Sequence, residues 1–579
     1  MKKILKKIMY FFTVIGFFTV IYGIGTLLLE VYKKQQYVSE NSILVINLDE
    51  KYSEVSDESI VDEFLDKKHY NFLKLIQSIE FAATDDNIKG ILACINISAL
   101  DMAQIQNVAQ VIEKFRKTGK PAYIFSHGFG PFGQGNREYY LATFFDKIFM
   151  QPHSTLGLNG ISIDIPFFKN VLQKIGVEAE FYTRYEYKTA MMSFTENNIS
   201  SEYENEMLKL GNGIIDEFTE AIKKNRTISE DLKSIIDRAP LSSEEALALN
   251  LVDELTYLPQ LKNRLKEENG VEHFISFDRY SAMLHSKGDE YPAIAFLHLG
   301  GIIAPGRSYN DIDGEYTLGS QDVLDDIKQI EKIKDLIAVV VRIDSPGGDY
   351  NASDEIYNAL KYLKQKKNVP LIITQGGYAA SGGYFISLAG DYIISEPLTI
   401  TGSIGVYGGK FIFNDLWKKL DISWKNLKIG KNADILSANT SFTAEEQKIF
   451  NRFLDDTYND FTTKVKENRQ LRQPIDEIAR GRVWTGKQAL ELGLVDELGG
   501  YDEAVFAALK QAGFSSNETY RIVNYPKEKN FGDKIRELLV FNDAKINEIL
   551  KQSGVDIRYL NLFKRLQYDT VMLPLNIKM

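Results

Sequence analysis

The chain has 579 residues, of which 44% are hydrophobic and 25% are charged, a composition typical of a folded protein with room for several domains. Its formal net charge of -11 argues against nucleic acid as a partner, because binding a phosphate backbone requires a basic surface. A single cysteine, Cys94, and six histidines without a His-Glu-x-x-His motif argue against a disulfide and a zinc site, so we expect no metal and no cofactor.

The first predicted element is a membrane span at residues 8–29. Residues 1–7 carry four lysines, and the next 22 residues carry no charge. A helix of that length rises about 33 Å, enough to cross a bilayer core. The lysines favour a cytoplasmic N-terminus, with the remaining chain outside the cytoplasm. A cleaved signal peptide is the alternative, but its apolar region is normally shorter and ends in small residues.

The rest of the chain divides into two halves with the same order of predicted elements. In the first half, strands and helices alternate at residues 90–95, 103–117, 121–125, 139–142 and 146–150. In the second half they alternate at residues 338–343, 352–366, 370–374, 384–389 and 391–394. The offset between matching blocks stays between 243 and 249, which indicates an internal duplication.

Strands that alternate with helices indicate parallel α/β units with right-handed crossovers. We therefore expect two α/β domains of one fold, at residues 42–269 and 291–525. Residues 270–290 form a polar linker between them. The tail at residues 526–579 has no predicted role.

A glycine-rich serine turn lies between a strand and a helix of the second half. Its sequence is Tyr-Ala-Ala-Ser-Gly-Gly-Tyr at residues 378–384, and small neighbours leave room around the hydroxyl of Ser381. The helix that follows points backbone N–H groups at this hydroxyl, a good setting for a nucleophile beside an oxyanion hole. A serine here can equally be a helix N-cap. The first half has Asn136 near the matching position, so the serine is absent from that copy.

A second glycine-rich turn, Asp-Ser-Pro-Gly-Gly-Asp at residues 344–349, follows another strand of the second half. Such a turn can present backbone N–H groups at the carboxyl edge of a parallel sheet, where ligands bind. A tight structural turn is the alternative. The matching segment of the first half, residues 96–100, lacks both glycines. Serine and glycine turn therefore occur in the same copy, which favours a functional role for both.

A nucleophilic serine needs a general base. His298 is the only histidine of the second domain, near its beginning. A lysine can serve if burial lowers its pKa. Lys188 is one of 68 basic residues, and residue patterns alone do not select it.

Four motifs of the second half occur in an order that resembles the signal peptide peptidase A (protease IV) family, in its long duplicated bacterial form. They are Asp-Ser-Pro-Gly-Gly at 344–348, Tyr-Ala-Ala-Ser-Gly-Gly-Tyr at 378–384, Leu-Thr-Ile-Thr-Gly-Ser-Ile-Gly at 398–405 and Val-Trp-Thr-Gly-Lys-Gln-Ala at 483–489. The resemblance covers the chain from the anchor to about residue 525.

The resemblance implies two tandem Clp protease/crotonase-like domains and a Ser-Lys dyad. It places the nucleophile at Ser381 and the general base at Lys188, with the hydroxyl of Ser403 holding the lysine. The backbone N–H groups of Gly348 and Gly382 would form the oxyanion hole. It further implies a homotetramer at the bacterial cytoplasmic membrane, single-pass and with its catalytic part extracytoplasmic. There it would degrade cleaved signal peptides and similar hydrophobic peptides.

Two other functions remain open. A crotonase-like acyl-thioester enzyme would share the fold and the oxyanion hole, but coenzyme A esters are not expected outside the cytoplasm. A non-catalytic membrane scaffold is conceivable because the first half lacks the serine. Against the scaffold, the second half keeps the serine, the glycine turn and Thr-Gly-Ser together.

Overall fold

The computed structural model describes residues 38–54, 70–284 except 132, 288, 290–310, 316–515, 518–527 and 571–572. The predicted cytoplasmic N-terminus, the membrane span at 8–29 and most of the tail after residue 526 lie outside the described residues. Among the helices of the described part, none is long and apolar enough to cross a membrane.

The first half forms a six-stranded parallel sheet. Its strands, in spatial order, are β10 (Glu254–Leu255), β6 (Lys147–Met150), β5 (Ala122–Ser126), β4 (Ile88–Cys94), β1 (Ser42–Asn47) and β11 (His273–Ser276). The helices of this half are α3 (Phe72–Thr84), α4 (Met102–Arg116), α5 (Asn136–Ala142), α9 (Leu232–Arg238), α10 (Ser243–Ala248), α11 (Leu258–Asn269) and α12 (Phe277–Ser281). Two short pairs accompany them, β2 (Tyr52–Ser53) with β3 (Tyr70–Asn71) and β7 (Thr155–Leu156) with β9 (Leu241–Ser242).

The second half repeats this plan with a larger sheet. Its main path is β22 (Val483–Thr485), β20 (Ile400–Gly402), β18 (Leu371–Ala380), β16 (Leu336–Ser345), β12 (Ala293–Gly300) and β24 (Arg521–Tyr525), with β19 (Tyr392–Ser395) and β23 (Glu497–Leu498) branching from β18. A small sheet beside it holds β14 (Tyr309–Asn310), β15 (Tyr316–Gly319), β13 (Ile302–Ala304), β17 (Gly347–Gly348) and β25 (Val571–Met572). The helices are α13 (Ser320–Glu331), α14 (Tyr350–Lys367), α15 (Gly382–Ser387), α17 (Ala444–Asn468), α18 (Ile475–Ile478), α19 (Gly486–Leu492) and α20 (Tyr501–Gln511). The tandem α/β organisation predicted from the duplication is thus confirmed.

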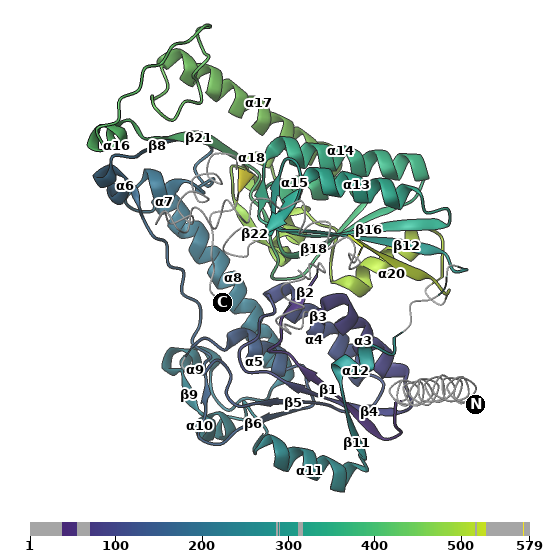
Figure 1. Cartoon of the computed structure of the whole chain (residues 1–579). Helices are drawn as coiled ribbons and strands as arrows, with labels where there is room; N and C mark the ends of the chain where they lie inside the picture. Colours follow the sequence, from purple (N-terminus) through teal and green to yellow (C-terminus); the bar gives the residue numbers. More distant parts are fainter. Residues whose placement is uncertain are drawn as a thin grey trace, which may run out of the picture.

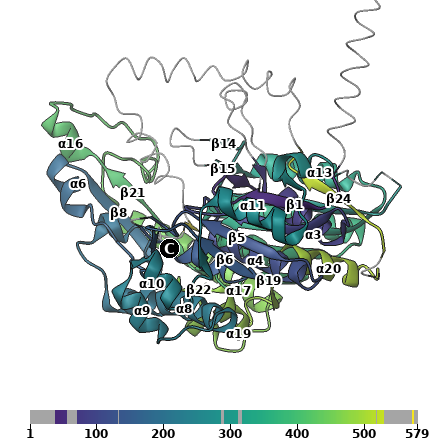
Figure 2. The ribbon, with the colours of Figure 1, turned by 90° about the horizontal axis from the view of Figure 1, so that it is seen from below.

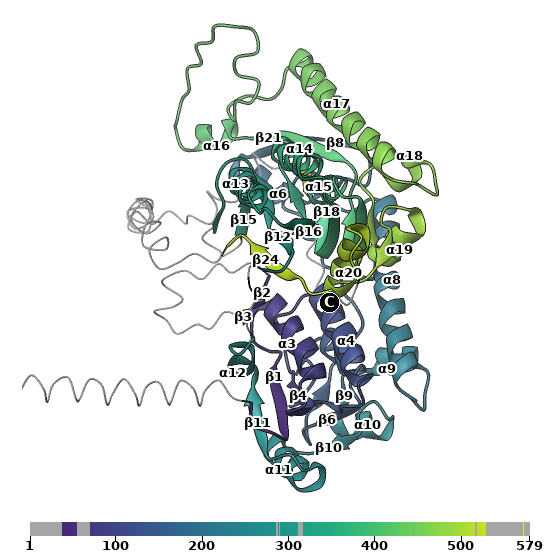
Figure 3. The same ribbon diagram turned by 90° about the vertical axis from the view of Figure 1, so that its right-hand side faces the viewer.

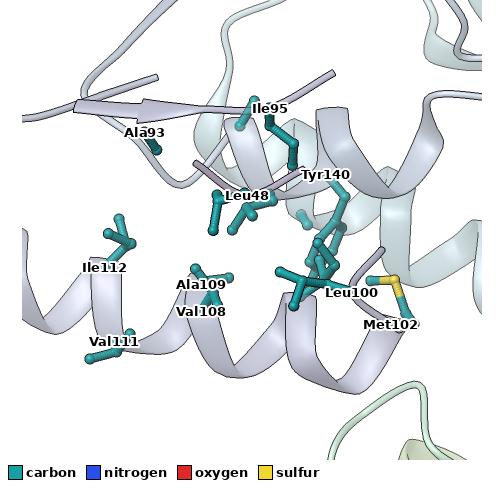
Figure 4. Packing of buried hydrophobic residues seen from close by; sticks show 14 of the residues in the cluster. Leu48, Ala93, Ile95, Leu100, Met102, Val108, Ala109, Val111, Ile112 and Tyr140 are labelled. Carbon is teal, nitrogen blue, oxygen red and sulfur yellow. The ribbon is translucent and has the colours of Figure 1, made fainter. Parts of the chain in front are cut away.

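The two halves stack in layers (Figure 1). Helices α3 and α4 lie between the first sheet and the second, while α13 and α14 cover the far face of the second sheet; the side view agrees (Figure 3). On the outer face of the first sheet lies α11, as the view from below shows (Figure 2). Helix α4 is buried almost all round, and its apolar residues pack against the first sheet near Leu48, Ala93 and Ile95 (Figure 4). The main hydrophobic core therefore runs across both halves.

An antiparallel strand pair joins the halves a second time. Strand β8 (Glu178–Arg184) of the first half pairs with β21 (Val406–Ile412) of the second along its whole length. Around this pair, which we call the arm, lie α6 (Lys169–Ile175), α7 (Met192–Thr195) and α16 (Asn414–Lys419). The long helix α8 (Ser201–Asn225) leads back from the arm to the first sheet (Figure 1). The arm brings the residues that follow β8 next to the second sheet.

One strand differs from the sequence prediction in a way that matters for the site. The predicted strand at 370–374 continues as β18 to Ala380, into the predicted turn. Its pairing with β16 skips from Ile343↔Gln375 to Ser345↔Ala379, so a bulge of extra residues lies in β18. Before the bulge β18 pairs with β19, and after it with β20. A bulge bends a strand, and this bend transfers β18 from one neighbour to the next.

Candidate active site

Ser381 lies at the junction of β18 and α15, where its backbone takes an unusual conformation. Its φ and ψ are 57° and -115°, a region that non-glycine residues rarely enter. Holding such a residue costs about 1–3 kcal/mol. The backbone is held by two hydrogen bonds, from Ser381 N to Gly402 O and from Phe385 N to Ser381 O, each 2.8 Å. Its side chain does not cap α15, so the N-cap alternative does not account for the hydroxyl.

Lys188 reaches this hydroxyl from the other half of the chain. It follows β8, and the β8–β21 pairing carries it to the second sheet. Its Nζ lies 2.6 Å from Oγ of Ser381, 3.0 Å from Oγ of Ser403 and 3.2 Å from the carbonyl oxygen of Ser403. The structure therefore brings together Ser381, Lys188 and Ser403, three of the five residues that the resemblance names.

Burial favours the neutral form of Lys188. The side chain is fully buried, and this desolvation lowers its pKa well below the usual value. A neutral amine has two N–H groups and one lone pair. Two N–H groups suit the two oxygens of Ser403, which leaves the lone pair for the hydroxyl proton of Ser381. This geometry is compatible with a neutral amine that accepts a proton from the hydroxyl of Ser381.

Ser403 is held in place from the opposite side. Its backbone also has a positive φ, 51°, and its N–H donates to the carbonyl oxygen of Arg482 at 2.7 Å. The residue after Ser403 is held in the same way: the carbonyl oxygen of Ile404 accepts the backbone N–H of Gly481 at 2.9 Å. The segment around Gly481 therefore fixes the hydroxyl that orients Lys188.

The other two named residues, Gly348 and Gly382, lie beside each other. A Cβ added to Gly382 would be 3.3 Å from the backbone nitrogen of Gly348. Gly348 has a φ of 156°, and a Cβ there would lie 2.0 Å from the carbonyl oxygen of Ile303. Only glycine fits this close approach. The two glycine-rich motifs thus meet next to Ser381, as the co-occurrence of the turns suggests.

The edge of β17 accepts an extended backbone. Strand β25 pairs antiparallel with β17, with Gly347 opposite Met572 and Gly348 opposite Val571. On its other side β17 pairs with β13 at Ile303. The glycine turn next to Ser381 therefore has an edge that binds a peptide strand.

The first half has lost this chemistry at the matching place. The side chain of Asn136 is buried and donates from Nδ2 to the carbonyl oxygen of Gly160 at 2.7 Å. His298, the histidine considered as a base, lies buried on β12, two strands from β18 in the sheet. Burial lowers its pKa to about 4. It does not lie at the serine.

Sequence reasoning missed Gly481. A Cβ at this position would lie 2.4 Å from the backbone nitrogen of Lys188, and its φ is 93°. Only glycine lets the lysine backbone approach so closely. The available signal was a glycine between two arginines, directly before the motif at 483–489.

Replacing Gly481 with alanine is expected to displace Lys188 and to lower kcat by about 10- to 100-fold, because a shift of about 1 Å in a catalytic group can have that effect. Gly430→Ala is the matched control: its φ is 104°, but its nearest neighbour, Cβ of Ala433, lies 4.0 Å away. Turnover of an apolar peptide and thermal unfolding of both variants check this. Equal kcat values for the two variants would contradict it.

Comparisons with known proteins identify related families. A family model described as "Peptidase family S49" matches residues 114–272 and 363–515, more than half of the chain, and one described as "Clp protease" matches residues 316–396. "Serine protease SPPA, chloroplastic" of Arabidopsis thaliana is 29% identical over 471 residues, which cover 78% of this chain and 67% of that protein.

Two bacterial proteins called "Protease 4" are similar over most of their length. The protein of Haemophilus influenzae is 28% identical over 501 residues, 82% of this chain and 79% of its own. That of Salmonella typhi is 29% identical over 453 residues, 76% of this chain and 71% of its own. Two matched segments and tandem α/β halves have one explanation: the chain belongs to peptidase family S49 and is a long, duplicated serine peptidase of the signal peptide peptidase A type.

Proposed function

We propose that this chain is a membrane-anchored serine endopeptidase that uses a Ser-Lys dyad, Ser381 and Lys188, to degrade cleaved signal peptides and similar hydrophobic peptides. The observation that carries the proposal is the distance of 2.6 Å between Nζ of Lys188 and Oγ of Ser381, 193 residues apart in the sequence. The burial that makes this lysine neutral supports the role of general base.

The reaction begins with proton transfer from Ser381 to Lys188. As the lone pair of Nζ takes the proton, Oγ forms a bond to the scissile carbonyl carbon, and the carbonyl electrons move to its oxygen. The Lys188 ammonium then returns the proton to the departing amine while the C–N bond breaks. Water repeats the sequence on the acyl-enzyme: its proton passes through Lys188 to Oγ, and the peptide acid leaves.

The negative charge of the tetrahedral intermediate needs donors. The backbone N–H groups of Gly348 and Gly382 serve this role, since the two glycines meet beside Ser381. Removing a single donor of this kind typically costs about 10²–10³ in kcat. The pairing of β25 with β17 supports a substrate backbone that binds along this edge of β17 in place of β25.

The rate should rise with pH through the pKa of Lys188, which burial holds well below its usual value. Only the deprotonated amine accepts the serine proton, so kcat/KM should increase about tenfold per pH unit on the acidic side of that pKa. A pH profile of hydrolysis of an apolar peptide measures this. A profile that stays flat down to pH 5 would argue against a lysine base.

The cellular setting is part of the proposal. Residues 8–29 anchor the chain in the cytoplasmic membrane of a bacterium, with the catalytic part on the outer face. Resistance of the membrane-bound chain to alkaline extraction tests the anchor, and release of the intact chain would exclude it.

We also propose a homotetramer. At the end of the arm, α6 and α16 are joined by a bond of 2.8 Å from Leu416 N to Gly176 O. The large apolar side chains exposed on α6 and in the segment after α16 are Phe168, Val171, Ile175, Leu420, Ile422, Trp424, Leu427, Ile429 and Leu436. So large an exposed apolar surface is rare on a monomer. Packing against a second copy of the chain would cover it, and this supports assembly. Analytical ultracentrifugation decides it; a monomer would exclude a ring.

An acyl-thioester enzyme of the same fold is the other candidate. It would not need a lysine beside a serine. A fluorophosphonate probe that labels Ser381 in the wild-type chain, together with cleavage of a hydrophobic signal peptide, tests the peptidase directly. Thioester turnover without labelling of Ser381 would favour the alternative.

A further inference from the structure

Two half-buried carboxyl groups, those of Asp344 and Asp101, lie at the bulge of β18, a few residues before Ser381. Asp344 lies in β16 where the pairing with β18 is interrupted, between Ile343 and Ser345, and its Oδ1 accepts the backbone N–H of Tyr378 at 2.9 Å. This bond spans the gap that the bulge opens between β16 and β18. Because an amide in a buried bulge has lost its strand partner, the carboxyl oxygen replaces a missing ladder hydrogen bond.

Both glycines of the bulge leave room for a carboxyl group. A Cβ at Gly376 would lie 2.8 Å from Cβ of Asp344, and one at Gly377 would lie 3.2 Å from Cγ of Asp101. Asp101 belongs to the other half, where it caps α4 by accepting the N–H of Gln104 at 2.8 Å. The bulge is therefore contacted by one carboxyl group from each half of the chain.

The bulge sets the positions of the reacting groups. Beyond it, β18 pairs with β20 from Tyr378↔Ile400 to Ala380↔Gly402. The next residues on these two strands are Ser381 and Ser403, the two hydroxyl groups that Lys188 contacts. A change in the bulge would shift Ser381 relative to β20 and so relative to the lysine.

We propose that Asp344 is a positioning residue, which holds the bulge of β18 in the register that places Ser381 opposite Lys188. This rests on the proposed function, because the alignment matters only if these two residues react. The first half supports the idea by analogy: Asn96 follows β4 there, and its Oδ1 accepts the backbone N–H of His127 after β5 at 2.7 Å. The side-chain amide of asparagine can thus accept the same backbone hydrogen bond as a carboxyl group.

Ionisation of Asp344 should therefore affect the position of Ser381 independently of the hydrogen bond that Asp344 accepts. The charged or titratable groups that face it are Asp101 from α4, Glu54 from the segment after β2, Arg342 from β16, Tyr378 from β18 and Tyr501 from α20. Burial, Asp101 and Glu54 raise the pKa of Asp344 to about 8, and Arg342 opposes them. Burial and Glu54 raise the pKa of Asp101 to about 6.

At neutral pH, the raised pKa of Asp344 therefore favours its protonated form beside Asp101. Arg342 does not offer a ready counter-charge, since its guanidinium already forms a two-bond ion pair with Glu54, 3.0 Å for each bond. Above about pH 8, ionised Asp344 would add a second negative charge to a buried site beside Asp101. The alignment of Ser381 with Lys188 should then become less precise, and activity should fall on the alkaline side of the pH profile.

The test compares D344A, D344N and the matched control D391A. Asp391 accepts the backbone N–H of Leu371 at 2.9 Å, so it makes the same kind of bond at the other end of β18. D344A should lower kcat by about 10- to 100-fold, with KM changed less than about threefold. D344N should restore kcat at pH 7 to within about threefold of wild type and remove the alkaline fall. D391A should lower the thermal midpoint and leave the pH profile as in wild type.

Labelling of Ser381 by a fluorophosphonate, with circular dichroism as the fold check, supplies a second readout that needs no peptide substrate. Slow labelling of folded D344A and recovery in D344N support the positioning role. Wild-type labelling in D344A, or equal impairment of D344A and D344N, overturns it while the proposed peptidase stands. If D344A does not fold, an alkaline fall that persists in D344N overturns the role. Failure of the wild-type chain to label at Ser381 refutes both proposals.

Discussion

Replacing Ser381 with alanine is expected to lower kcat for an apolar peptide by about 10⁶-fold, the scale found when a serine peptidase loses its nucleophile. The chain should still fold, because the backbone bonds of this residue to Gly402 and Phe385 do not use the side chain. Alanine removes the hydroxyl that lies 2.6 Å from Nζ of Lys188. Turnover measured with purified protein, and loss of fluorophosphonate labelling, check this result.

Ser387→Ala is the matched control. This serine lies in the same helix, α15, and is equally buried, but its hydroxyl donates to the carbonyl oxygen of Gly383 at 2.9 Å. It should lose some stability and retain turnover. Substantial activity in Ser381→Ala would mean that another group is the nucleophile.

Replacing Lys188 with alanine is expected to lower kcat by about 10²–10⁴-fold, the usual contribution of a general base. Because burial favours the neutral form of this lysine, its removal should leave no uncompensated charge, and folding should persist. The remaining activity should no longer rise with pH in the range where the wild-type rate does. Turnover over pH 5–9 and the rate of Ser381 labelling measure both effects.

Lys410→Ala provides the control for this second variant. Lys410 lies on β21 in the same arm, is also buried, and donates from Nζ to the carbonyl oxygen of Ile435 at 2.9 Å. Its loss should affect stability and leave the pH dependence intact. Full turnover by Lys188→Ala would exclude the dyad.

The sequence located most of the fold because duplicated patterns are local. Strand β4 covers Ile88–Cys94 where residues 90–95 were expected, and α14 covers Tyr350–Lys367 where 352–366 were expected. Alternation of buried strands and amphipathic helices follows from side-chain periodicity, which neighbouring residues alone determine. The bulge in β18 escaped prediction, because it depends on the register of β16 and on the side chain of Asp344.

Some residues of the candidate site could likewise be predicted from the sequence, and others could not. Ser381 and the glycine turn at residues 344–349 stand out in the sequence through small residues at strand ends and through their shared absence from the first half. Residue patterns could not distinguish Lys188 from the other basic residues; it was named only through the family resemblance. Its selection depends on the β8–β21 pairing, on burial and on the space left by Gly481.

By itself, then, the sequence determined a duplicated α/β chain with one serine-bearing copy, and by resemblance a lysine partner. Only the tertiary structure decided that the amine of Lys188 is buried within hydrogen-bond distance of Ser381, and that Asp344 and Asp101 meet at the strand behind it. The physical reason is distance along the chain. Desolvation and hydrogen-bond geometry arise from groups that folding brings together from both halves, and no local pattern records them.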